Sequence, residues 1–226
     1  MSMLTNLDLI RRVPLFAMLT PAQAEVLSSS VDKRRFKRGE LIVEQGKKCD
    51  ALYIILAGRA RVVVTDRKAR EVILATLQPG DYIGEMSLID SEPHSANVEA
   101  EVQTDALVLA GADFNRCLAE STSTVMAVMR GLVGRLRSAD RKIESLALMG
   151  VYGRVANVLL ESGVPLPGPD NIRVIREKIS RQDIAKMVGA SREMVSRVMK
   201  DFEEQGFIET QPDGAIWVKE RRKKPR

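Results

Sequence analysis

The hydrophobic pattern of the chain changes its period twice. Between Phe36 and Leu109, short apolar runs rich in β-branched residues alternate with glycines and a Pro-Gly-Asp turn. "LYIILAGRARVVVTD" holds two such runs separated at Gly58, "REVILATLQPGDYIGE" holds another, and "ALVLA" closes the series. Short strands with regular turn residues predict a small antiparallel barrel or roll. Before them, "TPAQAEVLSSS" predicts a helix with Thr20 as its N-cap and Pro21 at its first position.

A long helix is predicted next, from about Ser121 to Ala147. No proline interrupts it, and its apolar residues recur at alternating spacings of four and three, which is a heptad pattern. A narrow stripe of this kind favours pairing with a second helix over packing of the helix on its own domain. We therefore expect a homodimer formed through residues 125–146. The stripe consists of Val125, Met129, Leu132, Leu136, Ala139, Ile143 and Leu146.

The last third of the chain predicts a winged helix-turn-helix. "GRVANVLLESG" is a helix that ends at Gly163, and "IRVIREKI" is a candidate strand. Ser180, with Asp183 three residues later, begins a helix that stops at Gly189, and Ser191 begins a second one. "FIETQPDGAIWV" then predicts two strands around a Pro-Asp-Gly turn.

The three patterns together predict an α+β protein with three parts. Residues 1–120 are expected to form the β-roll domain, residues 121–149 the dimerisation helix, and residues 150–226 the winged helix-turn-helix domain.

Composition narrows the class of protein. Of 226 residues, 45% are hydrophobic and 29% charged, which is typical of a soluble globular protein. No apolar run approaches the ~18 residues of a membrane span, and the N-terminal stretch lacks the pattern of a signal peptide. Cys49 and Cys117 stand apart, with no metal-ligand spacing. We expect a cytoplasmic protein without membrane association, metal site or required cofactor.

The positive charge is concentrated near the C-terminus. Residues 171–226 carry 14 Lys and Arg against 9 Asp and Glu, which accounts for the net charge of +5 of the whole chain. A basic terminal module of this kind indicates a polyanionic partner, most often a nucleic acid such as double-stranded DNA, and a solvated charged surface is the alternative.

The two predicted helices of the helix-turn-helix carry the side chains that DNA recognition requires. The N-terminal end of the second helix enters the major groove in such a unit. Arginine there can donate two hydrogen bonds to guanine, and glutamate can accept one from cytosine. The first helix offers free N–H groups to a phosphate. The expected DNA-binding residues are Ser180, Arg181, Gln182, Ser191, Arg192, Glu193 and Arg197.

With these motifs the chain resembles the cyclic-AMP receptor protein/FNR (CRP/FNR) family of bacterial transcription regulators. "RQDIAKMVGASREMVSRVMKDFEEQGFI" is similar to the family's DNA-binding signature, and "LQPGDYIGEMSLID" to its cyclic-nucleotide-binding signature. The resemblance covers nearly the whole length. It implies an effector-binding β-roll, a long dimer helix and a C-terminal winged helix, with RNA polymerase as a further partner. It also implies base contacts from Arg192, Glu193 and Arg197 to a TGTGA-like half-site.

The effector is less defined by the resemblance. In the family's cyclic-AMP binders a Gly-Glu pair contacts the ribose, an Arg-Ser pair the phosphate and a Thr-Ser pair adenine. Here Gly84 and Glu85 keep the first pair, His94 replaces the arginine beside Ser95, and Ala139 and Asp140 replace the third pair. The expected effector-binding residues are Gly84, Glu85, Met86, Ser87, His94, Ser95, Ala96, Arg137, Asp140 and Arg141.

These changes argue against tight cyclic-AMP binding. Histidine is mostly neutral at pH 7, whereas arginine is a permanently charged fork. The Asp140 carboxylate can accept from guanine N1–H and N2–H₂. The resemblance then implies cyclic di-GMP as one candidate effector, because some members of the family that lack the full cyclic-AMP set respond to it. Another cyclic nucleotide, an unknown ligand, or no ligand are the alternatives, with Asp140 and Arg141 then being solvated helix positions.

Two other classes of function fit the sequence less well. A nucleotide-sensing subunit that does not bind DNA would not need the helix-turn-helix. An enzyme would need a nucleophile with its base, a metal cluster or a phosphate-binding loop, and the sequence offers none of these. A DNA-binding regulator is therefore the predicted function.

Overall fold

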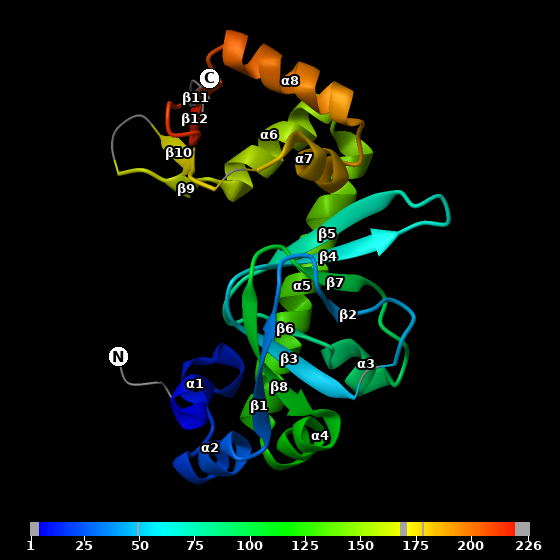
Figure 1. Ribbon diagram of the computed structural model, residues 1–226, viewed down its shortest axis with the longest axis vertical. Helices are drawn as coiled ribbons and strands as arrows, with labels where there is room; N and C mark the ends of the chain where they lie inside the picture. The colour runs from blue at the N-terminus through cyan, green and yellow to red at the C-terminus, as the bar shows by residue number, and fades with distance from the viewer. Residues whose placement is uncertain (1–4, 49, 168–170, 178, 220–226) are drawn as a thin grey trace. The chain divides into compact units, whose positions relative to one another are not determined.

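The computed structural model describes residues 5–48, 50–167, 171–177 and 179–219 (Figure 1). Cys49, Lys178 and the last seven residues of the basic C-terminal segment lie outside these ranges. The chain forms two compact units, residues 1–136 and residues 137–226. The division falls within the long helix α5 (Thr122–Leu148), so each unit contains part of that helix. Within the described ranges, no helix combines the length and apolarity needed to cross a membrane.

Besides the first part of α5, the described residues of the first unit form four helices and a 3₁₀ turn. Helix α2 begins as predicted, because the Thr20 hydroxyl accepts from the Gln23 N–H while the Gln23 side chain accepts from the Thr20 N–H. The elements are α1 (Asn6–Arg12), η1 (Pro14–Phe16), α2 (Pro21–Ser28), α3 (Glu85–Asp90) and α4 (Gly111–Glu120).

The strands of the first unit form two antiparallel sheets, which confirms the predicted roll. Their orders are β1-β8-β3-β6 and β2-β7-β4-β5. The bounds are β1 (Val31–Phe36), β2 (Leu41–Val43), β3 (Ala51–Ala57), β4 (Ala60–Thr65), β5 (Glu71–Leu77), β6 (Tyr82–Ile83), β7 (Asn97–Ala100) and β8 (Thr104–Ala110).

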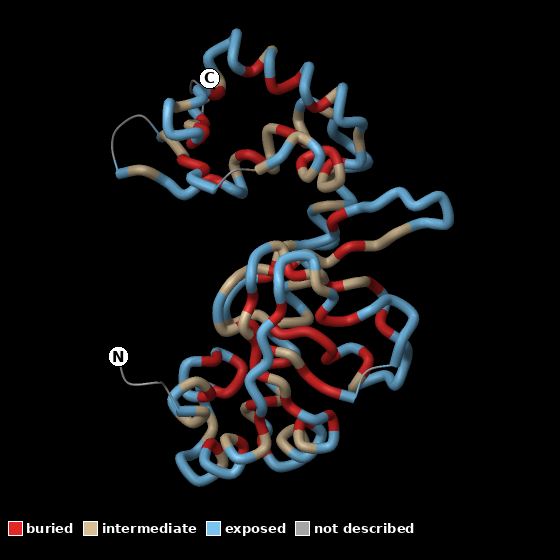
Figure 2. Tube along the Cα trace, viewed as in Figure 1, coloured by how far each residue is buried: buried red, intermediate tan, exposed pale blue. Residues whose placement is uncertain are grey.

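The core of the first unit lies along the central pair β3 and β8. Ile54 faces Leu107 across this pair, and Leu52 faces Leu109; all four side chains are fully buried. The two strands are largely red in the burial view (Figure 2). Each such side chain contributes about 1.5–3 kcal/mol by leaving water. The edge strand β6 pairs with β3 and leads directly into α3, so this core positions the start of α3.

The second unit is the winged helix-turn-helix predicted from the sequence. Helix α6 (Val151–Ser162) is followed by α7 (Arg181–Val188) and α8 (Arg192–Glu204). A four-stranded antiparallel sheet, in the order β11-β12-β10-β9, completes the unit. Its strands are β9 (Val164–Pro165), β10 (Ile172–Ile175), β11 (Ile208–Thr210) and β12 (Ile216–Lys219).

The core of the second unit joins its helices to its sheet. Val155 and Leu159 of α6, Ile184 of α7, and Val195 and Met199 of α8 are all fully buried. Packing on α6, α7 and the sheet fixes α8 by its apolar side and leaves its polar side exposed to solvent.

Candidate functional site

A small cavity lies where β6 passes into α3. Gly84 has φ 99° and caps the helix, a left-handed conformation that favours glycine. The cavity, called the α3 cavity below, has a volume of about 80 Å³. Ligand pockets typically exceed ~300 Å³, so a nucleotide requires this lining to open. The lining residues are Val43, Val62, Leu77, Tyr82, Ile83, Gly84, Glu85, Met86, Ser87, His94, Ser95, Ala96, Val98 and Arg135.

Glu85 is the buried acidic group of the α3 cavity. Its side chain is 1% exposed and forms an ion pair with Arg135 of α5. Burial raises the pKa of Glu85, and the Arg135 charge opposes that rise. The carboxylate keeps a second oxygen, so it can still accept a hydrogen bond from a ligand hydroxyl.

Arg135 is held on three sides. Besides the ion pair with Glu85, it donates to the backbone oxygen of Tyr82, and its guanidinium lies 4.8 Å from the centre of the Tyr82 ring. Among the described residues that line the α3 cavity, Arg135 is the one cation. It is therefore the group best placed to meet a phosphate there.

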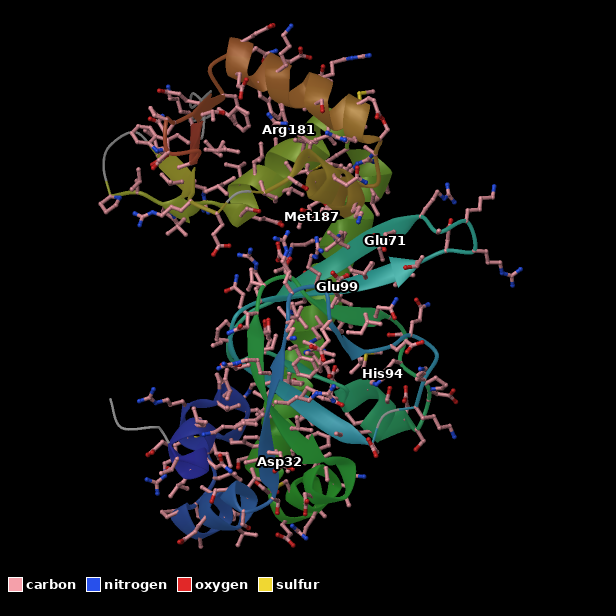
Figure 3. The ribbon with its side chains drawn as sticks, in the orientation of Figure 1. Asp32, Glu71, His94, Glu99, Arg181 and Met187 are labelled. Carbon is pink, nitrogen blue, oxygen red and sulfur yellow. The ribbon has the colours of Figure 1, made fainter. Side chains whose placement is uncertain are left out.

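His94 stands at the position where the resemblance to the CRP/FNR family leads us to expect the arginine of the cyclic-AMP binders. It is 9% exposed, and its Nδ1 lies 3.1 Å from the Ser87 hydroxyl. Burial lowers the pKa of His94, because desolvation disfavours the charged imidazole. The ring is thus neutral at pH 7. Figure 3 labels His94 in the first unit, and backbone bonds to Gly46 and Lys47 fix its position.

The structure brings together seven of the ten expected effector-binding residues, from Gly84 to Ala96, in the α3 cavity. The other three, Arg137, Asp140 and Arg141, are exposed on the part of α5 that belongs to the second unit. Sequence reasoning missed Arg135. A signal existed, because a glutamate expected inside a roll requires a cationic partner, and Arg135 precedes Ala139 by one helical turn.

The exposed apolar face of α5 differs at two positions from the expected stripe, because Val125 and Leu132 are partly buried while Met126 and Val133 are exposed. Leu132 is partly buried against the core of its own unit, whereas Val133 is 49% exposed. In the first unit the exposed apolar residues of α5 are Met126, Met129, Val133 and Leu136, and in the second they include Ile143 and Leu146. Leu132 is less exposed than the stripe requires, because it packs against the hydrophobic core of the first unit, and its part in pairing two chains stays a prediction.

The expected DNA-binding residues gather at the N-terminal ends of α7 and α8. The Ser180 and Ser191 hydroxyls accept from the Asp183 and Met194 N–H groups, and Gly189 makes the turn between the helices with φ 62°. Ser180, Gln182, Ser191, Arg192, Glu193 and Arg197 are exposed, and Arg181, which Figure 3 labels, is half-buried.

The Glu193 carboxylate accepts hydrogen bonds at the N-terminal end of its own helix. Hydrogen bonds from its own backbone N–H and from Ser191, together with the Arg192 charge, lower the pKa of Glu193. The carboxylate is therefore ionised and can act as an acceptor toward a base edge.

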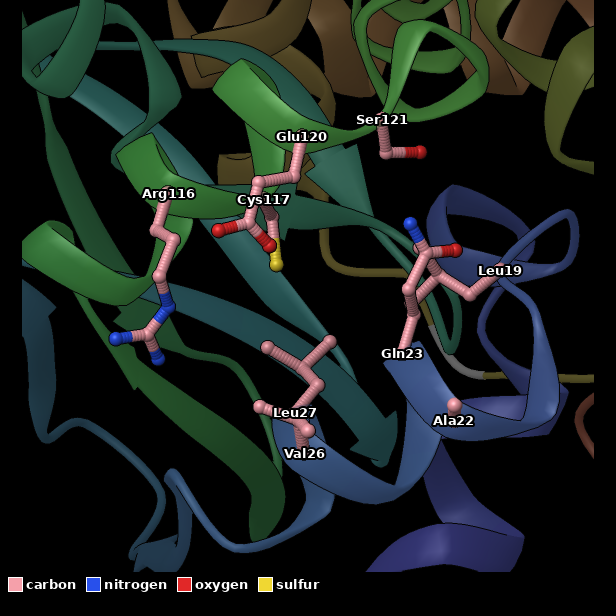
Figure 4. Close-up of a pocket in the computed structure, with 9 residues that line it drawn as sticks. All are labelled: Leu19, Ala22, Gln23, Val26, Leu27, Arg116, Cys117, Glu120 and Ser121. Atoms are coloured by element: carbon pink, nitrogen blue, oxygen red, sulfur yellow. The ribbon is translucent and has the colours of Figure 1, made fainter.

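A larger pocket lies between α2 and α4 (Figure 4). Its volume is about 190 Å³, and its walls are mostly apolar, with Leu19, Val26 and Leu27 on one side. Cys117 lines the other side, and burial raises the pKa of its thiol. The thiol is thus a poor nucleophile at neutral pH, and Arg116 beside it is paired with Asp113. We assign no site to this pocket.

Comparison with known proteins matches both units of the chain. The family model for the cyclic nucleotide-binding domain matches residues 33–121. The model for the Crp-like helix-turn-helix domain matches residues 153–223.

Several known regulators are similar to the chain over most of its length. The cAMP-activated global transcriptional regulator Vfr of Pseudomonas aeruginosa is 33% identical, over 78% of this chain and 84% of that protein. The cyclic AMP receptor protein of Thermus thermophilus is 32% identical, over 92% and 93%. Among solved structures, the c-di-GMP responsive global regulator CLP of Xanthomonas campestris superposes with a TM-score of 0.74 at 21% identity, covering 89% of this chain and all of that one.

Proposed function

The chain belongs to the CRP/FNR family of DNA-binding transcription regulators, and from this premise we propose that it is a homodimer gated by cyclic di-GMP. Its relatives are regulators rather than enzymes, and it has a cyclic nucleotide-binding domain and a Crp-like helix-turn-helix. The identity of the effector and the assembly state are the proposal.

His94 is the observation that carries the choice of effector. A neutral, buried imidazole cannot supply the charged fork that a cyclic phosphate receives from arginine. Loss of such a charge-assisted contact is worth about 2–3 kcal/mol, or roughly 30- to 160-fold in affinity. Cyclic AMP is therefore not expected to be the main effector, even though the curated relatives described above are named for it.

Guanine fits the remaining groups better than adenine. Asp140 is an exposed carboxylate on α5, flanked by the exposed guanidinium groups of Arg137 and Arg141. The carboxylate can accept from guanine N1–H and N2–H₂, and an arginine can stack on the base or meet its N7 and O6. Arg135 is available for a phosphate in the α3 cavity. The regulator CLP, which shares this fold, is described as c-di-GMP responsive.

We propose three functional parts. Residues 1–120 bind the effector, residues 121–149 pair two chains, and residues 150–226 bind DNA, each dimer also contacting RNA polymerase. The pairing surface is the exposed apolar face of α5, where Leu136 and Ile143 are more than 60% exposed in the single chain. Apolar residues of that size on one helix face favour burial against a second copy.

DNA contacts divide into two kinds in this proposal. Arg192, Glu193 and Arg197 of α8, aided by Ser191, meet base edges, because they are exposed at and beyond its N-terminal end. Ser180, Arg181 and Gln182 at the start of α7 meet phosphates. Two such units in a dimer would span half-sites about one helical turn apart.

A cyclic mononucleotide is the second candidate effector, since Gly84 and the buried Glu85 are both present. Calorimetry of the full chain against cyclic AMP, cyclic GMP and cyclic di-GMP tests the choice. We expect cyclic di-GMP to bind, Asp140→Ala to weaken it strongly, and His94→Arg to raise cyclic-AMP affinity. Glu144→Ala, an exposed carboxylate one turn further along α5, is the matched control.

The titrations should also change the affinity for a palindromic TGTGA-type duplex. Submicromolar binding of cyclic AMP by the wild type, coupled to DNA affinity, would overturn the reading of His94. Binding of none of the three nucleotides, with DNA binding intact, would indicate a ligand-independent regulator of the same family.

A further inference from the structure

Two glycines lie in the interior of α5, where almost any other residue would stabilise the helix better. Glycine is the least favourable residue in a helix interior apart from proline. At Gly134 an added Cβ would have no neighbour within 4 Å, so nothing in the chain's own fold requires glycine there. At Gly131 an added Cβ would overlap the Tyr82 hydroxyl oxygen and lie 2.9 Å from the ring carbon that carries it. Gly131 is therefore the glycine that a specific contact demands.

Tyr82 uses the space left by Gly131 to reach α5. It is 8% exposed, and its hydroxyl donates to the Val128 carbonyl oxygen at 3.3 Å, three residues before Gly131. A side chain at position 131 would push the phenol away from this carbonyl. The absence of a Cβ and the tyrosine hydroxyl are thus complementary features of α5 and β6.

The same tyrosine positions Arg135. The guanidinium lies over the Tyr82 ring, its Nη2 donates to the Tyr82 backbone oxygen, and its Nη1 donates to the buried Glu85. A planar guanidinium with these partners has its orientation fixed before any ligand arrives. Displacement of the ring would remove one face of this arrangement and move the backbone that forms another.

We propose that Gly131 and Tyr82 are positioning residues for the α3 cavity: the gap at Gly131 seats Tyr82, and Tyr82 holds Arg135 against Glu85 and toward the ligand phosphate. The last clause rests on the proposed function, because it assumes a nucleotide effector in this cavity. The first part concerns the ligand-free protein and stands without an effector.

Packing alone would predict a different outcome. If Gly131 only avoided a clash in the core, Gly131→Ala would change the free energy of unfolding but not the state of Glu85 or the affinity for a nucleotide in the folded protein. Gly134→Ala is the matched control, since it makes the same substitution in the same helix one turn away into open space.

The ligand-free test follows the Glu85 carboxyl by carbon NMR during a pH titration, with the resonance identified by its loss in Glu85→Gln. In Gly131→Ala we expect the pKa of Glu85 to rise above its wild-type value, as it should in Arg135→Gln, because both variants remove the guanidinium from the carboxylate. Gly134→Ala should titrate like the wild type. A Glu85 titration unchanged in folded Gly131→Ala would overturn the proposal.

The ligand test measures binding of cyclic di-GMP and cyclic AMP by calorimetry. For whichever nucleotide binds the wild type, Gly131→Ala should weaken binding at least tenfold and Gly134→Ala less than twofold. Gly131→Ala combined with Arg135→Gln should bind no more weakly than Arg135→Gln alone, since both act through one guanidinium. Tyr82→Phe should partly restore Gly131→Ala, because the overlapping oxygen is gone. Additive losses in the double variant would contradict positioning through Arg135.

The two tests separate the two proposals. If no nucleotide binds the wild type but Glu85 titrates as expected in the variants, the positioning of Arg135 holds and the effector proposal fails. If cyclic di-GMP binds the wild type and Gly131→Ala binds it like Gly134→Ala, the effector proposal holds and the positioning role is wrong. If cyclic AMP binds instead, the effector proposal fails, and the comparison of Gly131→Ala with Gly134→Ala still decides the positioning role.

Discussion

Replacing Arg135 by glutamine tests how much the charge of Arg135 contributes to the stability of a fold that buries Glu85. The substitution keeps a polar side chain, which is shorter than arginine, and removes the charge. Removing one partner of a buried ion pair typically costs about 3–5 kcal/mol, while exposed pairs contribute about 0–1 kcal/mol. Glu85 is 1% exposed but Arg135 is 39% exposed, so water screens one side of the pair. We expect a loss of about 2–3 kcal/mol in the free energy of unfolding at pH 7.

Protonation of Glu85 sets an upper limit to that loss. An unpaired Glu85 can avoid the cost of its charge by binding a proton, which from an unfolded pKa of about 4.3 requires about 1.36 kcal/mol per pH unit. The limit is therefore about 3.7 kcal/mol at pH 7 and about 1 kcal/mol at pH 5. Because burial raises the pKa of Glu85 in the folded protein, the native state holds more protons than the unfolded one. Stability is then lost as pH rises from the unfolded pKa through the folded pKa, and the variant extends this loss to higher pH.

Urea unfolding followed by far-UV circular dichroism, at pH 5 and pH 7, measures the effect. The difference between wild type and Arg135→Gln should be at least twice as large at pH 7 as at pH 5. Adding Glu85→Gln to the variant should remove this pH dependence, because no buried carboxyl remains to titrate. An equal loss at both pH values would show that Arg135 stabilises the fold by packing and not by charge.

Three further predictions concern DNA binding, assembly and the core of the second unit. Arg192→Ala should cost about 1–3 kcal/mol of DNA affinity and relax the preference at one base pair, whereas Arg181→Ala should weaken binding to all DNA sequences alike and reduce the salt slope by about one phosphate. Gel-shift titrations on matched and mismatched duplexes distinguish the two variants, and equal losses on both duplexes for Arg192→Ala would mean that Arg192 touches only phosphate. Leu136→Asp should yield monomers with poor operator affinity, because a dimer seam would bury its charge, and sedimentation of the wild type as a monomer at micromolar concentration would rule out the seam. Met199→Ala should destabilise the second unit by about 2–5 kcal/mol, since loss of this fully buried side chain would leave a cavity. Urea unfolding followed by the fluorescence of Trp217 in the same unit measures this loss of stability, and a loss below about 1 kcal/mol would contradict the packing described.

Local signals in the sequence determined most of the elements. Thr20, Ser180 and Ser191 cap helices as predicted, because capping depends on a side chain and an N–H group three residues away. The long helix was predicted at Ser121–Ala147 and spans Thr122–Leu148, since an uninterrupted heptad pattern specifies its own length. Glycine turns separated the strands of the roll, and the Pro-Asp-Gly turn separated those of the wing. The two signature motifs likewise identified the family, whose domain models match residues 33–121 and 153–223.

The tertiary structure decided which residues meet across the chain. Arg135 pairs with Glu85 fifty residues away, and although a buried glutamate calls for a cationic partner, only the fold selects Arg135 among the arginines of α5. Leu132 and Val133 are both apolar and adjacent, and only the placement of the roll against α5 buries the first and exposes the second. The neutral state of His94 and the need for glycine at position 131 also arise from neighbours distant in sequence. Burial, ion pairing and steric overlap depend on distances in space, which periodicity and capping along the chain do not encode.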